Sequence, residues 1–141
     1  MRKKTAAIFL ILALLMVLFF TFQNPEQSRD LSEAVRSWLE SIGIDVEYKS
    51  LRSNIHILEY FIVGLAVCEY CRSRGWKVWI GAVIGCGIGV VDESFKVLLP
   101  GREFESIDLV KDWIGVVAAV VVMTGCSKVL KRIDNNGKTT N

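Results

Sequence analysis

AAIFLILALLMVLFFTF, residues 6–22, is a run of 17 residues without a charged side chain. An α-helix rises about 1.5 Å per residue, so a hydrocarbon core about 30 Å thick needs roughly 20 helical residues, with a range of about 17 to 25. An open strand would leave backbone groups without hydrogen bonds in lipid. The run therefore predicts a membrane-spanning helix.

Three further apolar runs of membrane-spanning length follow. Together the runs predict transmembrane helices at about 6–22, 55–71, 77–97 and 107–126. A content of 52% hydrophobic residues would also suit a soluble domain, but soluble helices rarely gather these residues into such long runs. We predict an all-α membrane protein with one four-helix domain over 1–133 and a disordered polar tail at 134–141.

The first run also has features of a signal peptide, because Arg2, Lys3 and Lys4 precede it. The residues that follow it, 21–24, offer no small-x-small cleavage site. An uncleaved membrane anchor is therefore the favoured interpretation.

Basic residues gather at one end of the predicted helices. Ten of the 17 lie in the N-terminus, the loop between the second and third runs, and the C-terminal tail: Arg2, Lys3, Lys4, Arg72, Arg74, Lys77, Lys128, Lys131, Arg132 and Lys138. The two opposite loops, 23–54 and 92–112, hold 12 of the 15 acidic residues. The positive-inside rule then predicts that both termini are cytoplasmic and that these two loops lie outside.

The first outer loop contains apolar residues at helical spacing: Leu31, Ala34, Val35, Trp38, Leu39 and Ile42. Ser28 or Asp30 is expected to cap the start of this helix, and Gly43 to mark its end. The pattern predicts a short amphipathic helix on the outer membrane surface or on the other helices.

Composition and cysteine positions argue against several classes of protein. A net charge of +2 and the lack of a basic strip argue against a nucleic-acid partner. The four cysteines lie in or beside apolar runs and do not resemble a disulfide framework. Cys68 and Cys71 form a C-x-x-C pair at an expected cytoplasmic helix end, about 18 Å along that helix from His56. We therefore predict no metal site and no cofactor.

Carboxylates on three predicted helices reach a similar depth below the outer face. Helical rise places Glu59 about 7 Å inside the membrane edge and Asp92 and Glu93 about 6–9 Å inside it. Asp108 lies at the interface and Asp112 one turn deeper. A charge in the hydrocarbon costs about 2.5–3.5 kcal/mol on insertion scales, so such groups face the bundle interior and find partners.

Helical spacing groups these polar residues further. The sets that share a helical face are His56–Glu59–Tyr60, Asp92–Lys96 and Asp108–Asp112. Arg102, between the third and fourth runs, is expected to lie over the acids as an anion-binding group. The alternative interpretation is that these residues are helix caps, interfacial charges and structural salt bridges; Asp108, shortly after Ser106, fits a capping role.

Gly81, Gly85 and Gly89 recur every four residues in the third run. Such a face lets another helix approach closely, within the bundle or from a partner protein. It does not indicate a phosphate-binding loop.

The polar residues also form an ordered set of motifs: Arg52, His56-x-x-Glu59-Tyr60, Asp92-Glu93 with Phe95, Pro100-Gly101-Arg102, then Asp108, Asp112 and Gly115. Over residues 50–119 this set resembles the VanZ-like family. The resemblance implies a small multi-pass protein of the bacterial cell membrane, in a family whose founding member is associated with low-level teicoplanin resistance. It implies no particular reaction.

Three positions depart from the residues common in that family. Ser53 stands where a lysine is frequent, Lys96 where a glutamine is common, and Asp112 where an asparagine is frequent. Lys96 places a cation one turn from Asp92, so it can neutralise a carboxylate that the family leaves free.

Three functions remain open. The first is an outer-leaflet polar site that binds a membrane lipid or cell-wall precursor and affects glycopeptide sensitivity, with ligand-binding residues Arg52, Tyr60, Lys96, Arg102, Asp108 and Asp112. The second is a membrane-embedded hydrolase or transferase that acts on a lipid-linked substrate, with candidate catalytic residues His56, Glu59, Asp92 and Glu93. The third is a scaffold or transporter subunit that packs on a partner through the glycine face. The sequence does not decide whether the protein is an enzyme.

Overall fold

The computed structural model of the protein describes the backbone of residues 2–138 and the side chains of residues 3–129 other than 25, 48–50, 52 and 53. Over this part of the chain there are five helices and no strand: α1 (Arg2–Thr21), α2 (Pro25–Ser41), α3 (Tyr48–Ser73), α4 (Val78–Lys96) and α5 (Ser106–Lys138). Four of these described helices contain stretches long and apolar enough to cross a membrane: Lys3–Thr21, Asn54–Ser73, Val78–Lys96 and Ser106–Val129. The predicted all-α fold with four spans is confirmed.

Two helices are longer than the predicted spans. α3 begins at Tyr48 rather than near 55, and α5 continues to Lys138 rather than ending near 126. Both extensions are polar, so hydropathy marks the membrane-spanning part of each helix and not its end. The tail predicted from 134 overlaps this continuation of α5, and residues 139–141 lie outside the described residues.

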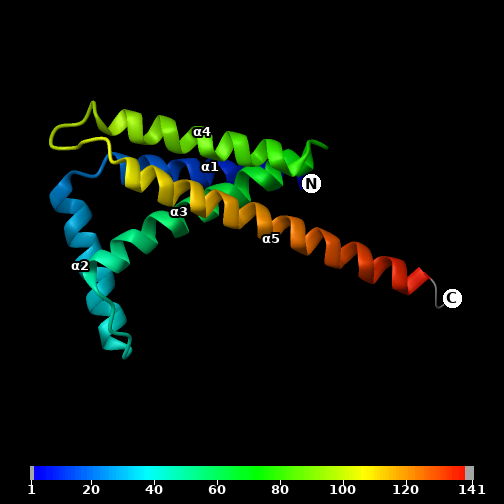
Figure 1. The fold of residues 1–141 in the computed structure, drawn as a ribbon, viewed down its shortest axis with the longest axis horizontal. Coiled ribbons are helices and arrows are strands. Elements are labelled where there is room, and N and C mark those ends of the chain that lie inside the picture. The colour runs from blue at the N-terminus through cyan, green and yellow to red at the C-terminus, as the bar shows by residue number, and fades with distance from the viewer. Residues whose placement is uncertain (1, 139–141) are drawn as a thin grey trace.

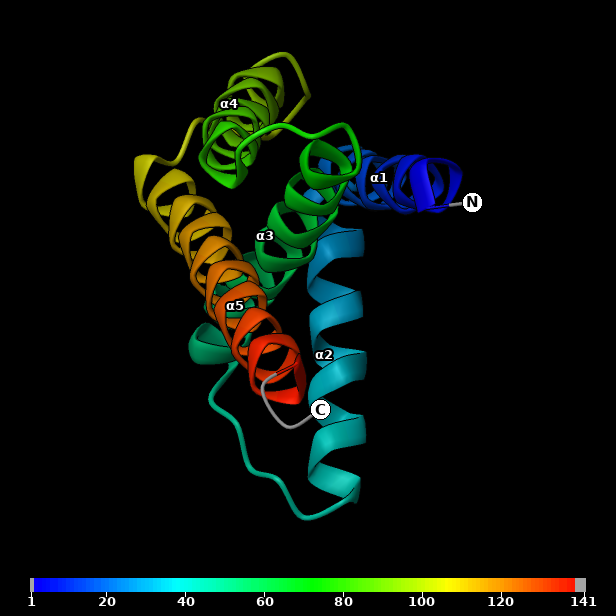
Figure 2. The same cartoon turned by 90° about the vertical axis from the view of Figure 1, so that its right-hand side faces the viewer.

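α3 lies at the centre of the bundle and packs against α1, α4 and α5 (Figure 2). Its closest neighbour is α5, and two glycines make that approach possible. A Cβ added at Gly64 would lie 2.7 Å from the Cβ of Ala119, and one added at Gly115 would lie 2.4 Å from the carbonyl oxygen of Ile57. The two backbones therefore meet with no side chain between them.

The glycine face of α4 also packs inside the chain. A Cβ at Gly81 would lie 2.9 Å from the Cys68 sulfur of α3, and one at Gly85 would lie 3.0 Å from a Val116 methyl group of α5. Gly89 faces Tyr60. Close helix packing within the bundle thus uses all three glycines, as small-residue faces do in membranes.

The distribution of side-chain sizes fits a protein surrounded by lipid. Small residues such as Ala13, Ala66 and Ala119 are buried in the core. Large apolar side chains instead point outward, and Phe19 and Val121 are 60% and 65% exposed. In lipid, the hydrophobic effect does not drive helices together, so they associate through close packing. Small side chains are therefore expected between the helices and large apolar ones on the outside.

α2 runs roughly perpendicular to α1 and α4, as both views show (Figures 1 and 2). The expected cap at Ser28 or Asp30 is wrong, because the helix begins earlier. Asn24 is the N-cap: its side chain accepts a hydrogen bond from Gln27 N at 2.8 Å, and the Gln27 side chain accepts one from Asn24 N at 3.2 Å. Pro25 then occupies the first helical turn, where its missing N–H costs nothing.

The helix ends as predicted, close to Gly43. This residue directly follows the C-cap residue Ile42 and has a φ of +85°, a backbone conformation that favours glycine. Along α2, Ser32 is buried, whereas Trp38 is 62% exposed. The predicted amphipathic helix is therefore present; within the described residues, Val35 and Leu39 of its apolar stripe are half-buried, whereas Trp38 and Ile42 are exposed. Such a stripe on a helix perpendicular to the spans suits a membrane interface.

Candidate functional site

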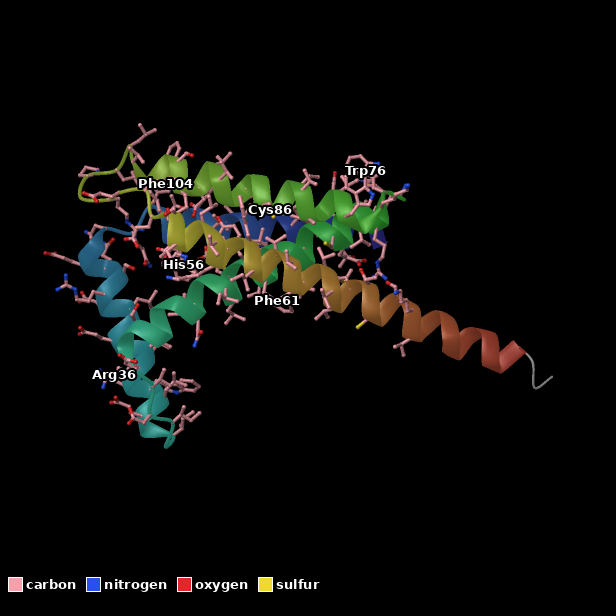
Figure 3. All side chains as sticks on the ribbon, viewed as in Figure 1. Arg36, His56, Phe61, Trp76, Cys86 and Phe104 are labelled. Atoms are coloured by element: carbon pink, nitrogen blue, oxygen red, sulfur yellow. The ribbon has the colours of Figure 1, made fainter. Side chains whose placement is uncertain are left out.

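A cavity of about 500 Å³ lies at the end of the bundle where α1 and α4 end and α5 begins. The start of α2, α3 and the loop between α4 and α5 complete its walls. Its charged lining residues and histidine are Arg29, His56, Glu59, Asp92, Glu93, Lys96, Arg102, Glu103, Glu105 and Asp108. Figure 3 shows His56 at this end of the bundle and Trp76 at the other end.

Lys96 is the buried cation of the cavity. Its ammonium group donates a hydrogen bond to Glu93 and lies 3.4 Å from the Asp92 carboxylate. The α-helical spacing of i+3 and i+4 aligns these groups on one face of α4, as the sequence predicted for Asp92 and Lys96. All three residues are buried, so the ion pairs are shielded from water.

Thr21 connects α1 to this group. Its hydroxyl contacts the Asp92 carboxylate and also lies 2.8 Å from the carbonyl oxygen of Val17. Sequence reasoning missed Thr21, although a hydroxyl near the end of an otherwise apolar run was a usable signal. The contact ties the last turn of α1 to the last turns of α4.

His56 of α3 lies between two carboxylates of α5. Its Nε2 atom is 3.5 Å from Asp108 Oδ2, and its Nδ1 atom is 3.4 Å from Asp112 Oδ1. The Lys111 ammonium lies 2.6 Å from the other Asp108 oxygen. Asp108 and Asp112 are four residues apart and so lie on one face of α5, where the His56 ring of α3 fits between them.

Tyr60 and Asp112 are fully buried beneath the cavity. Gly89 leaves room for both, because a Cβ there would lie 3.3 Å from the Tyr60 ring and 3.5 Å from the Asp112 Cβ. Within the described chain, the Tyr60 hydroxyl and both Asp112 carboxylate oxygens have no hydrogen-bond partner. Buried polar atoms of this kind normally have one, so the layer beneath the cavity has unused hydrogen-bonding capacity.

Arg102 binds the end of α1 instead of the acids it was expected to cover. Its Nη2 donates to the carbonyl oxygen of Gln23 at 2.6 Å and lies 3.4 Å from that of Phe20. Phe20 lies in the last turn of α1, where carbonyl oxygens lack intrahelical partners and carry partial negative charge, and Gln23 follows the helix by two residues. Among the residues described, its buried Nε has no hydrogen-bond partner, and Arg102 still lines the cavity.

The sequence profile of the VanZ/LLP1 family matches residues 6–129, which include all four candidate spans and the whole of α2. The chain belongs to the VanZ/LLP1 family. Neither the comparison with curated proteins nor that with solved structures gave a significant match. The resemblance seen in the motifs is confirmed, and this VanZ/LLP1 protein has the four candidate spans of a multi-pass membrane protein.

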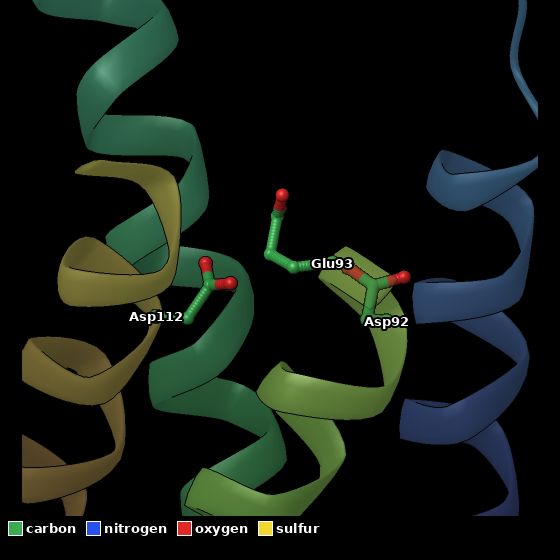
Figure 4. Close-up of side chains that lie close together, drawn as sticks. All are labelled: Asp92, Glu93 and Asp112. Atoms are coloured by element: carbon green, nitrogen blue, oxygen red, sulfur yellow. The ribbon is translucent and has the colours of Figure 1, made fainter. Parts of the chain in front are cut away.

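In this VanZ/LLP1 protein, α4 and α5 bring three carboxylates together. Figure 4 shows the Asp112 side chain pointing from α5 toward Asp92 and Glu93 of α4. One oxygen from each residue lies within 4.8 Å of the other two, and all three residues are buried. Helical rise predicted a similar depth for these acids, but the cluster itself forms only through the packing of α4 against α5.

The structure gathers nine of the ten candidate residues of this VanZ/LLP1 protein around the cavity. They are His56, Glu59, Tyr60, Asp92, Glu93, Lys96, Arg102, Asp108 and Asp112. The tenth, Arg52, lies on α3, but its side chain is outside the described residues. Cys68 lies near the other end of α3, where its thiol lies 3.8 Å from the carbonyl oxygen of Val78.

Proposed function

We propose that this VanZ/LLP1 protein binds the polar head of a membrane lipid or lipid-linked cell-wall precursor in the cavity. The observation that carries the proposal is a charged cavity of about 500 Å³ at one end of a four-span bundle. Charges at this depth are costly in lipid, so they usually serve a ligand pathway or binding site. Phe20, Leu31 and Ile55 add apolar surface to the lining, which suits a ligand with both a polar and an apolar part.

The distribution of basic residues supports access from the outer leaflet. The cavity lies at the end of the bundle opposite Arg2 and the short connection between α3 and α4, which carries Arg72, Arg74 and Lys77. Basic residues in short connections favour the cytoplasmic side. With both termini cytoplasmic, the cavity opens at the outer face, where wall precursors and glycopeptides meet. Occupation of the cavity by such a precursor would then alter glycopeptide sensitivity.

Ligand retention by purified variants tests this function. We expect Glu59→Gln, Asp92→Asn and Arg102→Gln each to reduce the lipid that co-purifies with the protein, measured by mass spectrometry. A charged hydrogen bond contributes about 1.5–3 kcal/mol, which corresponds to a reduction of about 10-fold or more. The same strains are scored for protein abundance and for sensitivity to a panel of wall-directed antibiotics.

Matched controls remove equivalent charges away from the cavity. Arg36 and Glu40 form an exposed pair at 2.8 Å on α2, and such pairs contribute little to stability. Arg36→Gln and Glu40→Gln are expected to retain the ligand and the antibiotic profile. Normal abundance with full ligand retention in the three cavity variants would contradict the proposal, whereas loss of abundance would favour a structural role for the charges.

The position of His56 favours a second function, hydrolysis or group transfer on a lipid-linked substrate. An imidazole held between the carboxylates of Asp108 and Asp112 at 3.5 and 3.4 Å can take and return a proton in a fixed orientation. We expect the purified protein to convert an envelope lipid to a product of different mass, and His56→Gln to abolish the conversion. A protein that leaves the mass of every envelope lipid unchanged would rule this function out.

A further inference from the structure

The buried acids in and beneath the cavity wall outnumber the buried lysines and arginines of the described residues. Glu59, Asp92, Glu93 and Asp112 are each at most 8% exposed, and Lys96 is the one lysine or arginine buried among them in the described part of the chain. If all four acids are ionised, three negative charges remain without a buried lysine or arginine as a partner. An unpaired buried carboxylate costs several kcal/mol, so it either takes up a proton or is balanced by a cation, and a cation bound here would offset the excess charge.

The geometry of three of these acids matches what a small cation requires. Asp92, Glu93 and Asp112 each offer an oxygen within 4.8 Å of the others, so small side-chain rotations would bring all three into contact with a single ion between them. Carboxylate oxygens are the ligands that Mg²⁺, Ca²⁺ and Mn²⁺ prefer. The trio provides no sulfur or nitrogen atom, which disfavours softer metals.

Independently of these carboxylates, the buried Tyr60 hydroxyl has unused hydrogen-bonding capacity. The Tyr60 side chain is fully buried, and its hydroxyl has no hydrogen-bond partner anywhere in the described residues. The Tyr60 ring lies beside Asp112, because a Cβ added at Gly89 would lie 3.3 Å from that ring and 3.5 Å from the Asp112 Cβ. A neutral hydroxyl oxygen at this point can hydrogen-bond to a water molecule of a hydrated ion.

We infer that Asp92 and Glu93 of the cavity wall and Asp112 beneath it form a binding site for a divalent cation. Mg²⁺ is usually held by one or two carboxylates together with the phosphate of a ligand. The ion would therefore face the cavity and bind a phosphate-bearing head group, which deepens the proposed function and rests on it. This arrangement lets a strongly acidic cavity hold an anionic lipid head.

Neighbouring side chains hold the three carboxylates in place. Thr21 contacts Asp92, and His56 lies 3.4 Å from Asp112. The backbone N–H of Glu105 points to the second oxygen of Glu93 at 3.4 Å. Such outer contacts orient metal-binding carboxylates. Lys96 contacts Glu93 and Asp92 and would compete with the ion, so it limits the affinity of the site.

Titration of the purified, detergent-solubilised full chain with Mn²⁺, followed by electron paramagnetic resonance, tests the inference. We expect saturable binding of a single Mn²⁺, displaced by excess Mg²⁺. Asp112→Asn and Glu93→Gln are each expected to weaken Mn²⁺ binding by at least about 10-fold. Losing a group that merely hydrogen-bonds to a metal ligand already costs about 10- to 100-fold in affinity, and these two residues are proposed to bind the ion directly. The matched control Asp30→Asn removes an exposed acid of α2 and is expected to bind as the unmodified chain does.

The outcomes separate the cation site from the proposed function. A monodisperse unmodified protein that binds no Mn²⁺ at millimolar concentration overturns the inference, whatever the variants do. Unchanged Mn²⁺ affinity in a folded Asp112→Asn or Glu93→Gln protein also overturns it. If the protein binds no Mn²⁺ but still retains lipid in the presence of EDTA, the cation site is wrong and the proposed function stands. Saturable Mn²⁺ binding without any retained lipid supports the cation site and counts against the proposed function.

Discussion

Gly115→Val is expected to prevent α3 and α5 from packing, because no side chain fits at this point. A Cβ at position 115 would lie 2.4 Å from the carbonyl oxygen of Ile57 and 2.8 Å from the backbone nitrogen of Phe61. Both are backbone atoms, which cannot rotate away as the end of a side chain can. Overpacking a core costs about 1–3 kcal/mol when side chains can adjust. Here the helices themselves must separate, so we expect a loss of at least about 3 kcal/mol.

The thermal unfolding midpoint in detergent measures this effect. Gly125→Val is the matched control on the same helix, because no atom of the described residues lies within 4 Å of a Cβ placed there. We expect the control to unfold near the unmodified midpoint and Gly115→Val to unfold well below it. Asp112 lies one turn before Gly115, and His56 precedes Ile57, so ligand retention should fall as well. An unchanged midpoint for Gly115→Val would contradict the close packing of α3 and α5.

Lys96→Met is expected to destabilise the protein by a comparable amount. The substitution preserves much of the side-chain volume but leaves Glu93 and Asp92 without their ammonium partner. Removing one member of a buried ion pair typically costs about 3–5 kcal/mol, because the remaining charge is left unpaired. Accumulation in the membrane and the unfolding midpoint should therefore both fall.

A double variant identifies the cause. Adding Glu93→Gln to Lys96→Met removes one of the two carboxylates left unpaired, so part of the loss in the unfolding midpoint should be recovered. Lys128→Met removes an exposed lysine from α5 and should have little effect. Mn²⁺ should also raise the midpoint of Lys96→Met, since the freed carboxylates belong to the proposed cation site. If the double variant is no more stable than the single one, the ion pair is not the source of the loss.

Depth along each helix could be predicted from the sequence, because it depends only on helical rise and on where the apolar run begins. Glu59, Asp92 and Asp112 were assigned to a similar level in this way, and the structure places Glu59 and Asp92 in the wall of one cavity and buries Asp112 beneath it. The pairing of Asp92 with Lys96 was predictable for the same reason, since i+4 neighbours on one helix meet regardless of the rest of the fold.

Contacts between helices could not be predicted, because they depend on how far each helix is rotated about its axis. The bracketing of His56 by two aspartates of α5 needs the close approach that Gly115 permits. Arg102 was expected over the acids, yet it donates a hydrogen bond to the backbone carbonyl oxygen of Gln23, just after α1. Every residue carries such a carbonyl group, so the pattern of side chains does not mark this acceptor. The cap of α2 was misplaced because the Asn24 capping box outcompetes Ser28 and Asp30.

The sequence alone determined the number of spans, the presence of the amphipathic helix and the family, because run length, periodicity and motif order are local properties of the chain. Only the tertiary structure decided that Asp92, Glu93 and Asp112 meet within 4.8 Å and that Thr21 and Arg102 join α1 to the cavity. These contacts depend on residues brought together across helices, and the helices approach where glycine removes the side chains between them.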